Sequence, residues 1–274
     1  DVPEDDWDKL NVVFATSDGS VRRNALSDFT NVKSNGKIAM KLPEGVSLVA
    51  ARICDPADDV LLVTAGGRAI RFRVGDVRVF KGRDSTGVRG IRLAAGDVVV
   101  AMSVLRHFEA TPEERAAYLK MRRAVAGPVE GEEETAEPES EEAVADIALG
   151  QERYAAMSAA EELILTVTER GLGKLSSSHD YPLRGRGGQG VAAIDRALRG
   201  GRVAAAFPVQ PDDQVMLATD RGQSIRCPVD GISFRSRSAG GVRVLNVAPD
   251  ERVVSVAWIA ERGEDEEDGG APAG

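Results

Sequence analysis

The sequence has few aromatic residues, few cysteines and histidines, and no long apolar run. Aromatic residues make up 4% of the 274 residues, which argues against a core built on large aromatic side chains. Cys54 and Cys227 lie far apart with no CxxC pair, and they form no ligand cluster with His107 or His179, so neither a disulfide scaffold nor a zinc site is predicted. No stretch approaches the roughly 18 apolar residues of a membrane span, and the first residues lack signal-peptide features. We therefore expect no membrane association and a reducing, cytoplasmic setting.

Motifs of catalysis and nucleotide binding are also missing. Neither His107 nor His179 stands in a nucleophile–base arrangement, and no Gly-x4-Gly-Lys-Ser/Thr loop is present. Tyr118 and Tyr154 lie in or beside an irregular insertion, and Tyr181 precedes a proline in a loop. We therefore predict no enzyme activity, no small-molecule substrate, no metal site and no cofactor for this chain alone.

The net charge of −9 argues against a nucleic-acid ligand until it is divided along the chain. Residues 1–10, 109–161 and 262–274 carry net charges of −4, −9 and −4. Residues 11–108 carry +6 and residues 162–261 carry +2. The acidity is therefore confined to three peripheral stretches, and the remainder is basic.

A phrase of an apolar run, a threonine, a turn glycine and a short basic strand occurs four times. Each occurrence predicts a β-hairpin. The threonine and glycine pairs are Thr16 and Gly19, Thr64 and Gly67, Thr168 and Gly171, and Thr219 and Gly222.

A second phrase follows each hairpin and opens with a glycine, at positions 36, 87, 190 and 241. The alternating segments 36–42 and 87–93 predict a strand with one buried face. A final apolar strand follows in each repeat, at 46–53, 98–105, 202–208 and 252–259. Each repeat is thus predicted to supply four strands.

Equivalent glycines recur at intervals of 48 to 51 residues, apart from one gap that is about fifty residues longer. Four-stranded units at this period predict an all-β, propeller-like array of four blades. A β-sandwich would also give many short strands, but it has no reason to repeat the same phrases in order.

The expected domain organisation is a repeat array with an insertion and two acidic ends. The insertion begins with Thr111-Pro112-Glu113-Glu114, a capping box that predicts a helix from about Pro112 to Ala126. A Glu-rich stretch from Pro128 to Glu142 predicts disorder, and a weakly helical stretch follows as far as Glu161. The segments are an acidic lead-in at 1–10, repeats at 11–59, 60–108, 162–213 and 214–261, the insertion at 109–161, and an acidic, disordered tail at 262–274.

Basic residues recur at equivalent places in the repeats, which predicts a positive perimeter suited to a bent phosphate backbone. The alternative for any single residue is a solvated charge on an exposed strand. The candidate DNA-binding residues are Arg22, Arg23, Lys33, Lys37, Lys41, Arg71, Arg73, Lys81, Arg83, Arg89, Arg92, Lys174, Arg184, Arg186, Arg226, Arg235, Arg237 and Arg243.

One glycine-rich loop is of special interest. Arg184-Gly185-Arg186-Gly187-Gly188-Gln189-Gly190 contains a GxGxxG spacing, but a strand rather than a helix is expected after it, so a dinucleotide site is not favoured. A flexible basic loop that lets the backbone approach phosphate is the preferred interpretation, and a plain turn is the alternative.

These phrases resemble the C-terminal domain of the bacterial DNA gyrase A subunit. The resemblance rests on Gly87-Val-Arg-Gly-Ile-Arg-Leu93, on Thr16-Ser-Asp-Gly-Ser-Val-Arg-Arg23 and on Lys37-Ile-Ala-Met-Lys-Leu42. It covers residues 11–108 and 162–261. It implies a β-pinwheel, in which blades exchange a strand with their neighbours and duplex DNA wraps around the basic edge.

The resemblance also implies partners outside this chain. In the holoenzyme, two A and two B subunits pass a wrapped DNA segment through a double-strand break, and ATP hydrolysis by the B subunit drives negative supercoiling. ATP and Mg²⁺ are then used elsewhere in the complex, the cleavage tyrosine lies in a part of the A subunit that this chain does not contain, and the setting is the bacterial cytoplasm, at the nucleoid.

Two departures from the family pattern are visible. The family usually has six blades, so the resemblance implies that two would precede Asp1. The family's Gln-Arg-Arg-Gly-Gly-Lys-Gly box resembles residues 184–190, but Gly185 replaces an arginine and Gln189 replaces the lysine, and the heptad lies in a later repeat. We expect it to be a divergent copy of that box.

Two other interpretations of the whole chain stay open. The topoisomerase IV A subunit shares the blade type, and a propeller-like protein-interaction module would need no DNA. For the acidic segments, competition with DNA phosphates and a solvated spacer are both possible interpretations.

Overall fold

Four hairpins form the centre of the structure, as the repeated phrase predicts. The computed structural model describes residues 2–30, 34, 36–126, 147–195, 197 and 200–259. The hairpin strands are β1 (Asn11–Thr16) and β2 (Ser20–Ala25), β4 (Asp59–Thr64) and β5 (Arg68–Arg73), β8 (Leu163–Thr168) and β9 (Leu172–Ser177), and β12 (Gln214–Thr219) and β13 (Ser224–Pro228).

The turn of each hairpin explains why threonine and glycine recur. Gly67 has a φ of 77°, in the left-handed region that glycine adopts without a Cβ penalty. The Thr64 Oγ1 accepts a hydrogen bond from the Arg68 amide at 3.1 Å, and Thr168 does the same for Leu172 at 3.2 Å. In these two hairpins the side chain of the recurring threonine therefore closes the turn.

The predicted final strand of each repeat is confirmed, and it pairs antiparallel with the first strand of its hairpin. These are the inner strands of the blades. They are β3 (Leu48–Cys54), β7 (Val99–Leu105), β11 (Val203–Val209) and β15 (Val253–Ile259).

The fourth strand of a blade comes from the next repeat, so neighbouring blades exchange a strand. The strand orders are β3-β1-β2-β6, β7-β4-β5-β10 and β11-β8-β9-β14, while the fourth sheet has the described order β15-β12-β13. The exchanged strands are β6 (Val88–Arg89), β10 (Val191–Ala192) and β14 (Val242–Arg243).

The exchanged strands are shorter than the alternation predicts. Only two residues of the segment 87–93 are in a strand, because the amides of Gly90 and Ile91 both turn to the Gly19 carbonyl and the chain wraps around the receiving hairpin. The predicted strand at 36–42 is wrong for the described residues 36–42, which pair with no described strand and leave Ile38 71% exposed.

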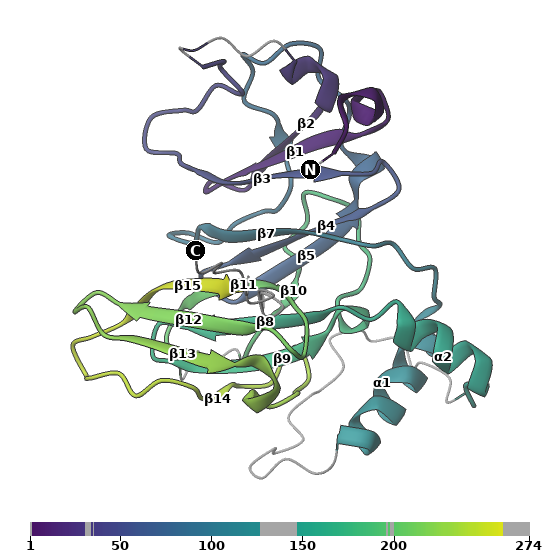
Figure 1. Cartoon of the computed structure of the whole chain (residues 1–274), viewed down its shortest axis with the longest axis vertical. Coiled ribbons are helices and arrows are strands. Elements are labelled where there is room, and N and C mark those ends of the chain that lie inside the picture. The colour runs from purple at the N-terminus through teal and green to yellow at the C-terminus, as the bar shows by residue number, and fades with distance from the viewer. Residues whose placement is uncertain are drawn as a thin grey trace, which may run out of the picture.

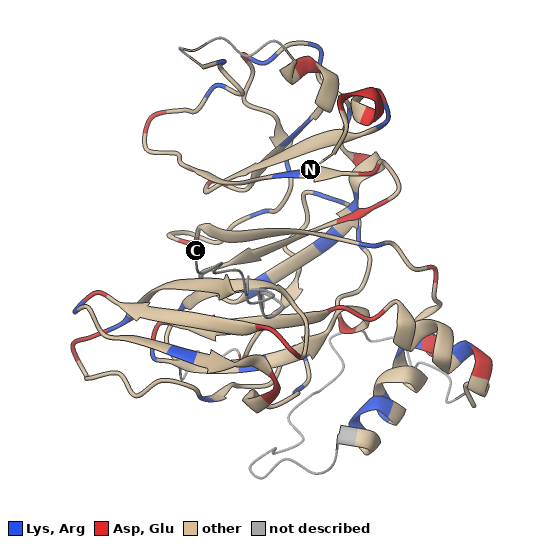
Figure 2. Ribbon diagram, in the orientation of Figure 1, with Lys and Arg blue, Asp and Glu red and all other residues tan. Residues whose placement is uncertain are grey.

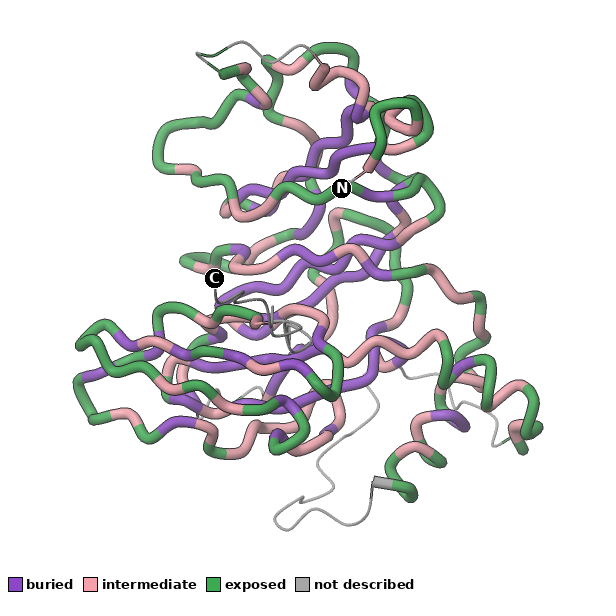
Figure 3. Tube along the Cα trace, viewed as in Figure 1, coloured by how far each residue is buried: buried purple, intermediate pink, exposed green. Residues whose placement is uncertain are grey.

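Three cores lie between successive blades (Figure 1, Figure 3). The first joins side chains such as Val13 and Val21 to Leu62 and Phe72, and two further clusters repeat this arrangement between blades two and three and between blades three and four. Most of the buried side chains in these cores are small or branched and apolar, with Phe72 and Tyr181 as the aromatic members, which accounts for the low aromatic content.

Two helices and five short 3-10 turns complete the described structure. The α1 helix (Pro112–Ala126) begins at the predicted capping box, since the Glu114 amide donates to Thr111 Oγ1 at 3.2 Å and the Thr111 amide to Glu114 Oε2 at 2.9 Å. The α2 helix (Gln151–Ala159) forms the predicted second stretch. The turns are η1 (Glu4–Lys9), η2 (Leu26–Phe29), η3 (Val74–Asp76), η4 (Ser178–Asp180) and η5 (Val229–Gly231).

The two helices lie side by side beyond one end of the sheets (Figure 1). The predicted disorder of 128–142 and of the acidic tail at 262–274 falls outside the described residues. Within the described part of the chain, no helix is long and apolar enough to cross a membrane.

Candidate nucleic-acid interface

The outer edge of the first three blades is formed by what we call the exchanged segments, residues 79–92, 183–195 and 234–246. Each one begins with a parallel bridge to the second hairpin strand of the preceding blade, at Val79, Leu183 and Phe234. Each continues as a loop and then adds its short strand to that blade. The three loops are therefore structurally equivalent.

The first two exchanged segments touch one another through the glycine-rich loop. The Gly187 amide donates to the Gly90 carbonyl at 2.6 Å, and the Arg92 amide donates to the Gly188 carbonyl at 2.8 Å. The Arg186 guanidinium donates to the Arg89 carbonyl at 3.1 Å. The loop then continues into β10 rather than into a helix, so it is not a dinucleotide fingerprint.

Eight of the candidate cations are exposed, and six of these lie on exchanged segments. Figure 2 shows that basic residues occur in every blade. The six are Lys81, Arg89, Arg92, Arg184, Arg186 and Arg243, and the other two are Lys41 and Arg226.

Four further candidates are partly buried, with contacts that restrain them. Lys37 donates to the carbonyls of Asp28 and Thr30 at 3.0 and 2.9 Å. Arg83 donates to the Ile38 carbonyl at 3.0 Å. The other two are Arg73, whose guanidinium lies 3.5 Å from an Asp59 oxygen, and Arg237, which donates to the Asp180 carbonyl at 2.9 Å.

Five candidates are buried, which differs from the expectation that they face DNA. They are Arg22, Arg23, Arg71, Lys174 and Arg235. Four of them lie on the second hairpin strand, which is covered because an exchanged segment adds outside it, while Arg235 lies on an exchanged segment. Lys33 lies outside the described residues.

The buried arginines at equivalent places link one blade to the next. Arg23 donates to the Val74 carbonyl at 3.0 Å, and Arg71 donates to the Ser178 carbonyl at 2.9 Å, in both cases at the 3-10 turn of the following blade. A buried guanidinium that binds a carbonyl holds the blades together and cannot reach a DNA phosphate at the same time.

Asp59 forms the centre of a buried charged cluster. Its carboxylate lies 2.8 Å from the Arg71 guanidinium and 3.1 Å from His107 Nδ1, and its side chain is 1% exposed. His179 is also buried and donates from Nε2 to the Met157 carbonyl at 2.8 Å. Both histidine rings are thus held by contacts within the fold, and the described residues contain no group of three or more metal-ligating side chains.

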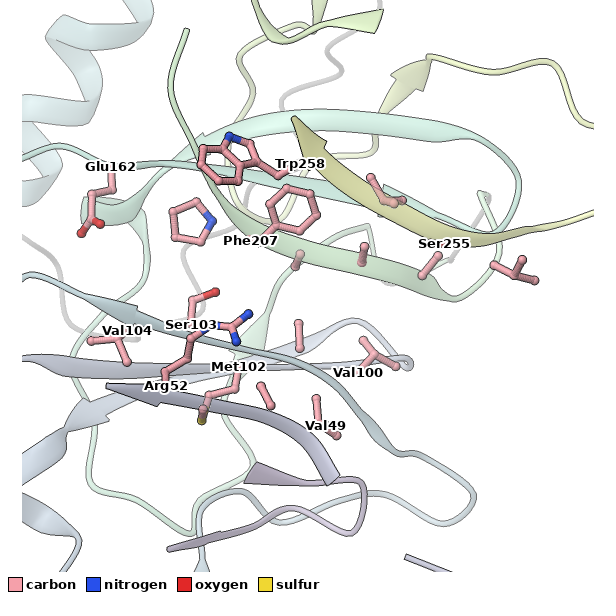
Figure 4. A pocket seen from close by; sticks show the side chains of 18 of the residues that line it. Val49, Arg52, Val100, Met102, Ser103, Val104, Glu162, Phe207, Ser255 and Trp258 are labelled. Atoms are coloured by element: carbon pink, nitrogen blue, oxygen red, sulfur yellow. The ribbon is translucent and has the colours of Figure 1, made fainter. Parts of the chain in front are cut away.

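The inner strands line a cavity of about 780 Å³, on the opposite side of the blades from the exchanged segments. Figure 4 shows Phe207 and Trp258 on one side of it and Val100 and Met102 on the other. Most of the residues that line it are apolar, and Arg52 is its only cation among the described lining residues. This cavity offers little to a phosphate backbone.

Two basic residues next to the exchanged segments were not among the candidate DNA-binding residues. Arg68 donates to the carbonyls of Gln189 and Gly190 at 3.3 and 2.5 Å, so it holds the glycine-rich loop. The Arg78 guanidinium lies 4.2 Å from the centre of the Phe80 ring. In the sequence, Arg68 directly follows the turn glycine Gly67. This position beside the turn could have identified it as a residue that binds the neighbouring loop.

The sequence model of the family described as "DNA gyrase C-terminal domain, beta-propeller" matches four segments, residues 10–55, 58–106, 162–210 and 213–257. These matches coincide with the four blades and leave out the insertion. The chain belongs to this family. The predicted blade architecture and the resemblance to the gyrase A C-terminal domain are therefore confirmed.

Proteins similar to this chain include the DNA gyrase A subunits of two bacteria. The one from Granulibacter bethesdensis is 50% identical over 271 residues, which are 95% of this chain and 29% of that protein. The one from Salmonella typhimurium is 32% identical over 258 residues, or 94% of this chain and 23% of that protein. The chain thus spans less than a third of these relatives.

Two solved structures share the fold. A structure titled "Structure of DNA gyrase A C-terminal domain" has a TM-score of 0.64 at 21% identity and covers 92% of this chain and 67% of its own. A "Crystal structure of the C-terminal domain of DNA topoisomerase IV" has a TM-score of 0.67 at 20% identity and covers 94% and 64%. At these identities the two structures support the fold alone.

Proposed function

We propose that this chain binds duplex DNA without sequence preference along its exchanged segments and bends it, as the C-terminal part of a DNA gyrase A subunit. The observation that carries the proposal is the recurrence of exposed cations on equivalent outer segments. Arginine and lysine on loops and short strands bind phosphate and DNA shape without reading base edges.

The energetics are compatible with bending. Smooth bending of a site of 20 to 30 base pairs costs on the order of 1–6 kcal/mol. Several charge-assisted hydrogen bonds to phosphate, each worth about 1.5–3 kcal/mol, would offset this cost. The buried arginines contribute indirectly, because they fix the blades relative to one another.

The proposed setting is the bacterial gyrase complex. The relatives, which are gyrase A subunits by name, suggest that this chain's partners are the B subunit of gyrase and the rest of its own A subunit. The chain would then support ATP-dependent supercoiling without a catalytic site or cofactor of its own. A bacterial, nucleoid-associated location follows from the same proposal. The alternatives are a protein-interaction module and the topoisomerase IV A subunit.

The test is fluorescence anisotropy of this chain with labelled duplexes of about 20 and 60 base pairs over a salt series. We expect steeply salt-dependent binding that favours the longer duplex. The triple variant Arg89→Ala, Arg92→Ala, Arg184→Ala should weaken binding and flatten the log–log salt slope by about 2 to 3, since each phosphate contact contributes about 0.9.

A matched triple variant controls for net charge. Arg52→Ala, Lys120→Ala and Arg221→Ala remove three exposed cations that lie outside the exchanged segments. This variant should keep the wild-type slope. Negligible binding of both duplexes at low salt, or equal effects of the two triple variants, would refute a DNA contact along the exchanged segments and favour the protein-interaction alternative.

A further inference from the structure

Two buried cations occupy the same place in different repeats. Arg22 and Lys174 are each the third residue after the turn glycine, on the second strand of the hairpin. Both are 0% exposed. Neither side chain can meet a DNA phosphate, although both resemble exposed basic residues in the sequence.

Lys174 binds the loop of the third exchanged segment. Its Nζ donates to the carbonyl of Ser236 at 2.9 Å, to that of Ala239 at 2.8 Å and to that of Arg237. An ammonium group has three N–H donors, so all of them are used on one loop of four residues.

Arg22 binds the loop of the first exchanged segment in the same manner. Its guanidinium donates to Ser85 Oγ at 2.7 Å, and to the carbonyls of Ser85 and Gly82. Asn24, two residues further along the strand, accepts from Arg22 Nε at 2.8 Å and donates to the Gly82 carbonyl at 3.0 Å. A different side chain therefore performs the same task in a different blade.

The second exchanged segment shows what happens without such a cation. Ile70 occupies the equivalent position, and the loop above it is the glycine-rich stretch 184–190. That loop is held instead by its contacts with the first exchanged segment and with Arg68, the first residue of β5 in the receiving blade. The buried cation thus accompanies the two loops that are not glycine-rich.

The loops held in this way have little regular structure of their own, and they carry exposed or partly exposed cations. The first loop carries Lys81 and Arg83, and the third carries Arg237 and leads to Arg243. Loops that are ordered before binding lose less conformational entropy when they meet a ligand.

We propose that Lys174 and Arg22 are positioning residues, which bind main-chain carbonyls of the exchanged segments and hold these loops in the shape that meets DNA phosphates. The inference rests on the proposed DNA binding. It assigns a role in affinity to two cations that touch no DNA.

Lys174 gives this inference a pH signature. Burial lowers the pKa of Lys174 to about 7, while Asp180 and Asp195 favour its charged form and Arg235 and Arg237 oppose it. Above that pH the amine keeps only two protons for three carbonyls. The loop should therefore loosen as the pH rises from 6.5 to 8.5.

The experiment measures the affinity of the full chain for a labelled duplex of about 60 base pairs at fixed salt. At pH 6.5, Lys174→Met should bind roughly three- to tenfold more weakly than wild type, with an unchanged log–log salt slope because no phosphate contact is lost. Lys120→Met, an exposed lysine on α1, is the matched control. Amide exchange at residues 236–239 should be faster in Lys174→Met without DNA.

The pH comparison is independent of how well Lys174→Met folds. Wild-type affinity should fall between pH 6.5 and 8.5, and Lys174→Arg, which stays charged, should keep its affinity at pH 8.5. A pH dependence that persists in Lys174→Arg, or wild-type affinity in a folded Lys174→Met, would overturn the positioning role alone. If wild type binds no DNA at both pH 6.5 and pH 8.5, the proposed function is overturned, and the DNA role of Lys174 with it.

Discussion

Gly87 shows how closely an exchanged segment approaches the blade that receives it. Its φ is 103°, and a Cβ at this position would overlap the carbonyl oxygen of Val21 on β2. Gly190 stands in the same relation to the Ala69 carbonyl on β5. Glycine is thus required here both for its backbone conformation and for space.

We expect Gly87→Ala to lower the free energy of unfolding by about 2 to 4 kcal/mol, because left-handed strain and overlap with a main-chain atom add up. Urea unfolding followed by circular dichroism measures this change. Gly45→Ala is the control, since Gly45 has a φ of 75° and a methyl group at its Cβ position would meet nothing within 4 Å. It should lose only about 1 kcal/mol, and an equal loss in both variants would argue against a tight approach at Gly87.

For single residues, the sequence predicts which types recur but not which of them are exposed and which are buried. Cations do recur after the turn glycines, and Arg89 and Arg184 are exposed as expected. Arg22 and Lys174 look the same in sequence, yet they are covered by a segment that arrives from the next repeat. Burial that depends on a distant segment leaves no local pattern.

At the scale of elements, the insertion packs against the third blade through an aromatic cluster. The Tyr118 ring of α1 lies 5.0 Å from the His179 ring of η4 and 5.1 Å from the Tyr154 ring of α2. Arg122, further along α1, lies 4.5 Å from the centre of the Phe234 ring in the third exchanged segment. The helices therefore contact both the third blade and its outer edge.

This packing should weaken in acid. Burial lowers the pKa of His179, Glu161 and the Met157 carbonyl raise it, and Arg71 and Arg115 lower it further. Because the folded-state pKa lies below the unfolded value of about 6.5, the unfolded chain binds more protons near that pH. Stability is then full above about pH 6.5 and falls as the pH drops below it.

The measurement is the thermal midpoint, together with amide exchange in α1, at pH 5.5 and 7.5. We expect both to show weaker structure at pH 5.5, and the difference to shrink in His179→Gln. His107→Gln serves as the comparison, because these are the chain's two histidines. If His179→Gln retains the full wild-type difference, His179 is not the group responsible.

The capping box made α1 predictable, whereas its packing was not. Thr111 and Glu114 form the reciprocal hydrogen bonds that the motif requires, and these are local in sequence. The partner of Tyr118 is His179, which lies some sixty residues away, on the far side of the Glu-rich stretch. The strand predicted at 36–42 failed although its local pattern was present. Residues that alternate form a strand only when another strand lies beside them to pair with, and no described strand pairs with these residues.

At the scale of the whole molecule, an acidic chain carries a basic edge. The net charge is −9, while six exposed candidate cations lie on the exchanged segments. Charges separated by more than about 10 Å are screened at 0.1 M salt. At low ionic strength the negative charge of the whole chain therefore weakens DNA binding. At higher ionic strength this distant charge is screened, and the cations of the exchanged segments dominate the interaction with DNA.

Deleting residues 128–142 removes eight glutamates and no basic residue. We expect this deletion to tighten DNA binding roughly three- to tenfold at about 50 mM salt and to have little effect at about 300 mM, because the interaction is screened. Replacing the eight glutamates with glutamine keeps the length and should give the same result. Unchanged affinity at low salt in both variants would favour a solvated spacer.

Strand exchange also sets the order in which blades can be completed on the ribosome. Arg22 can bind its partner Ser85 only after 63 further residues have been synthesised, and Lys174 can bind Ser236 only after 62. Arg68 can bind Gln189 only after 121 further residues, because the insertion is translated in between. At about 5–20 residues per second, the second hairpin of the nascent chain holds an unpaired outer edge about twice as long as its neighbours, and such an edge is where newly made chains would associate with one another.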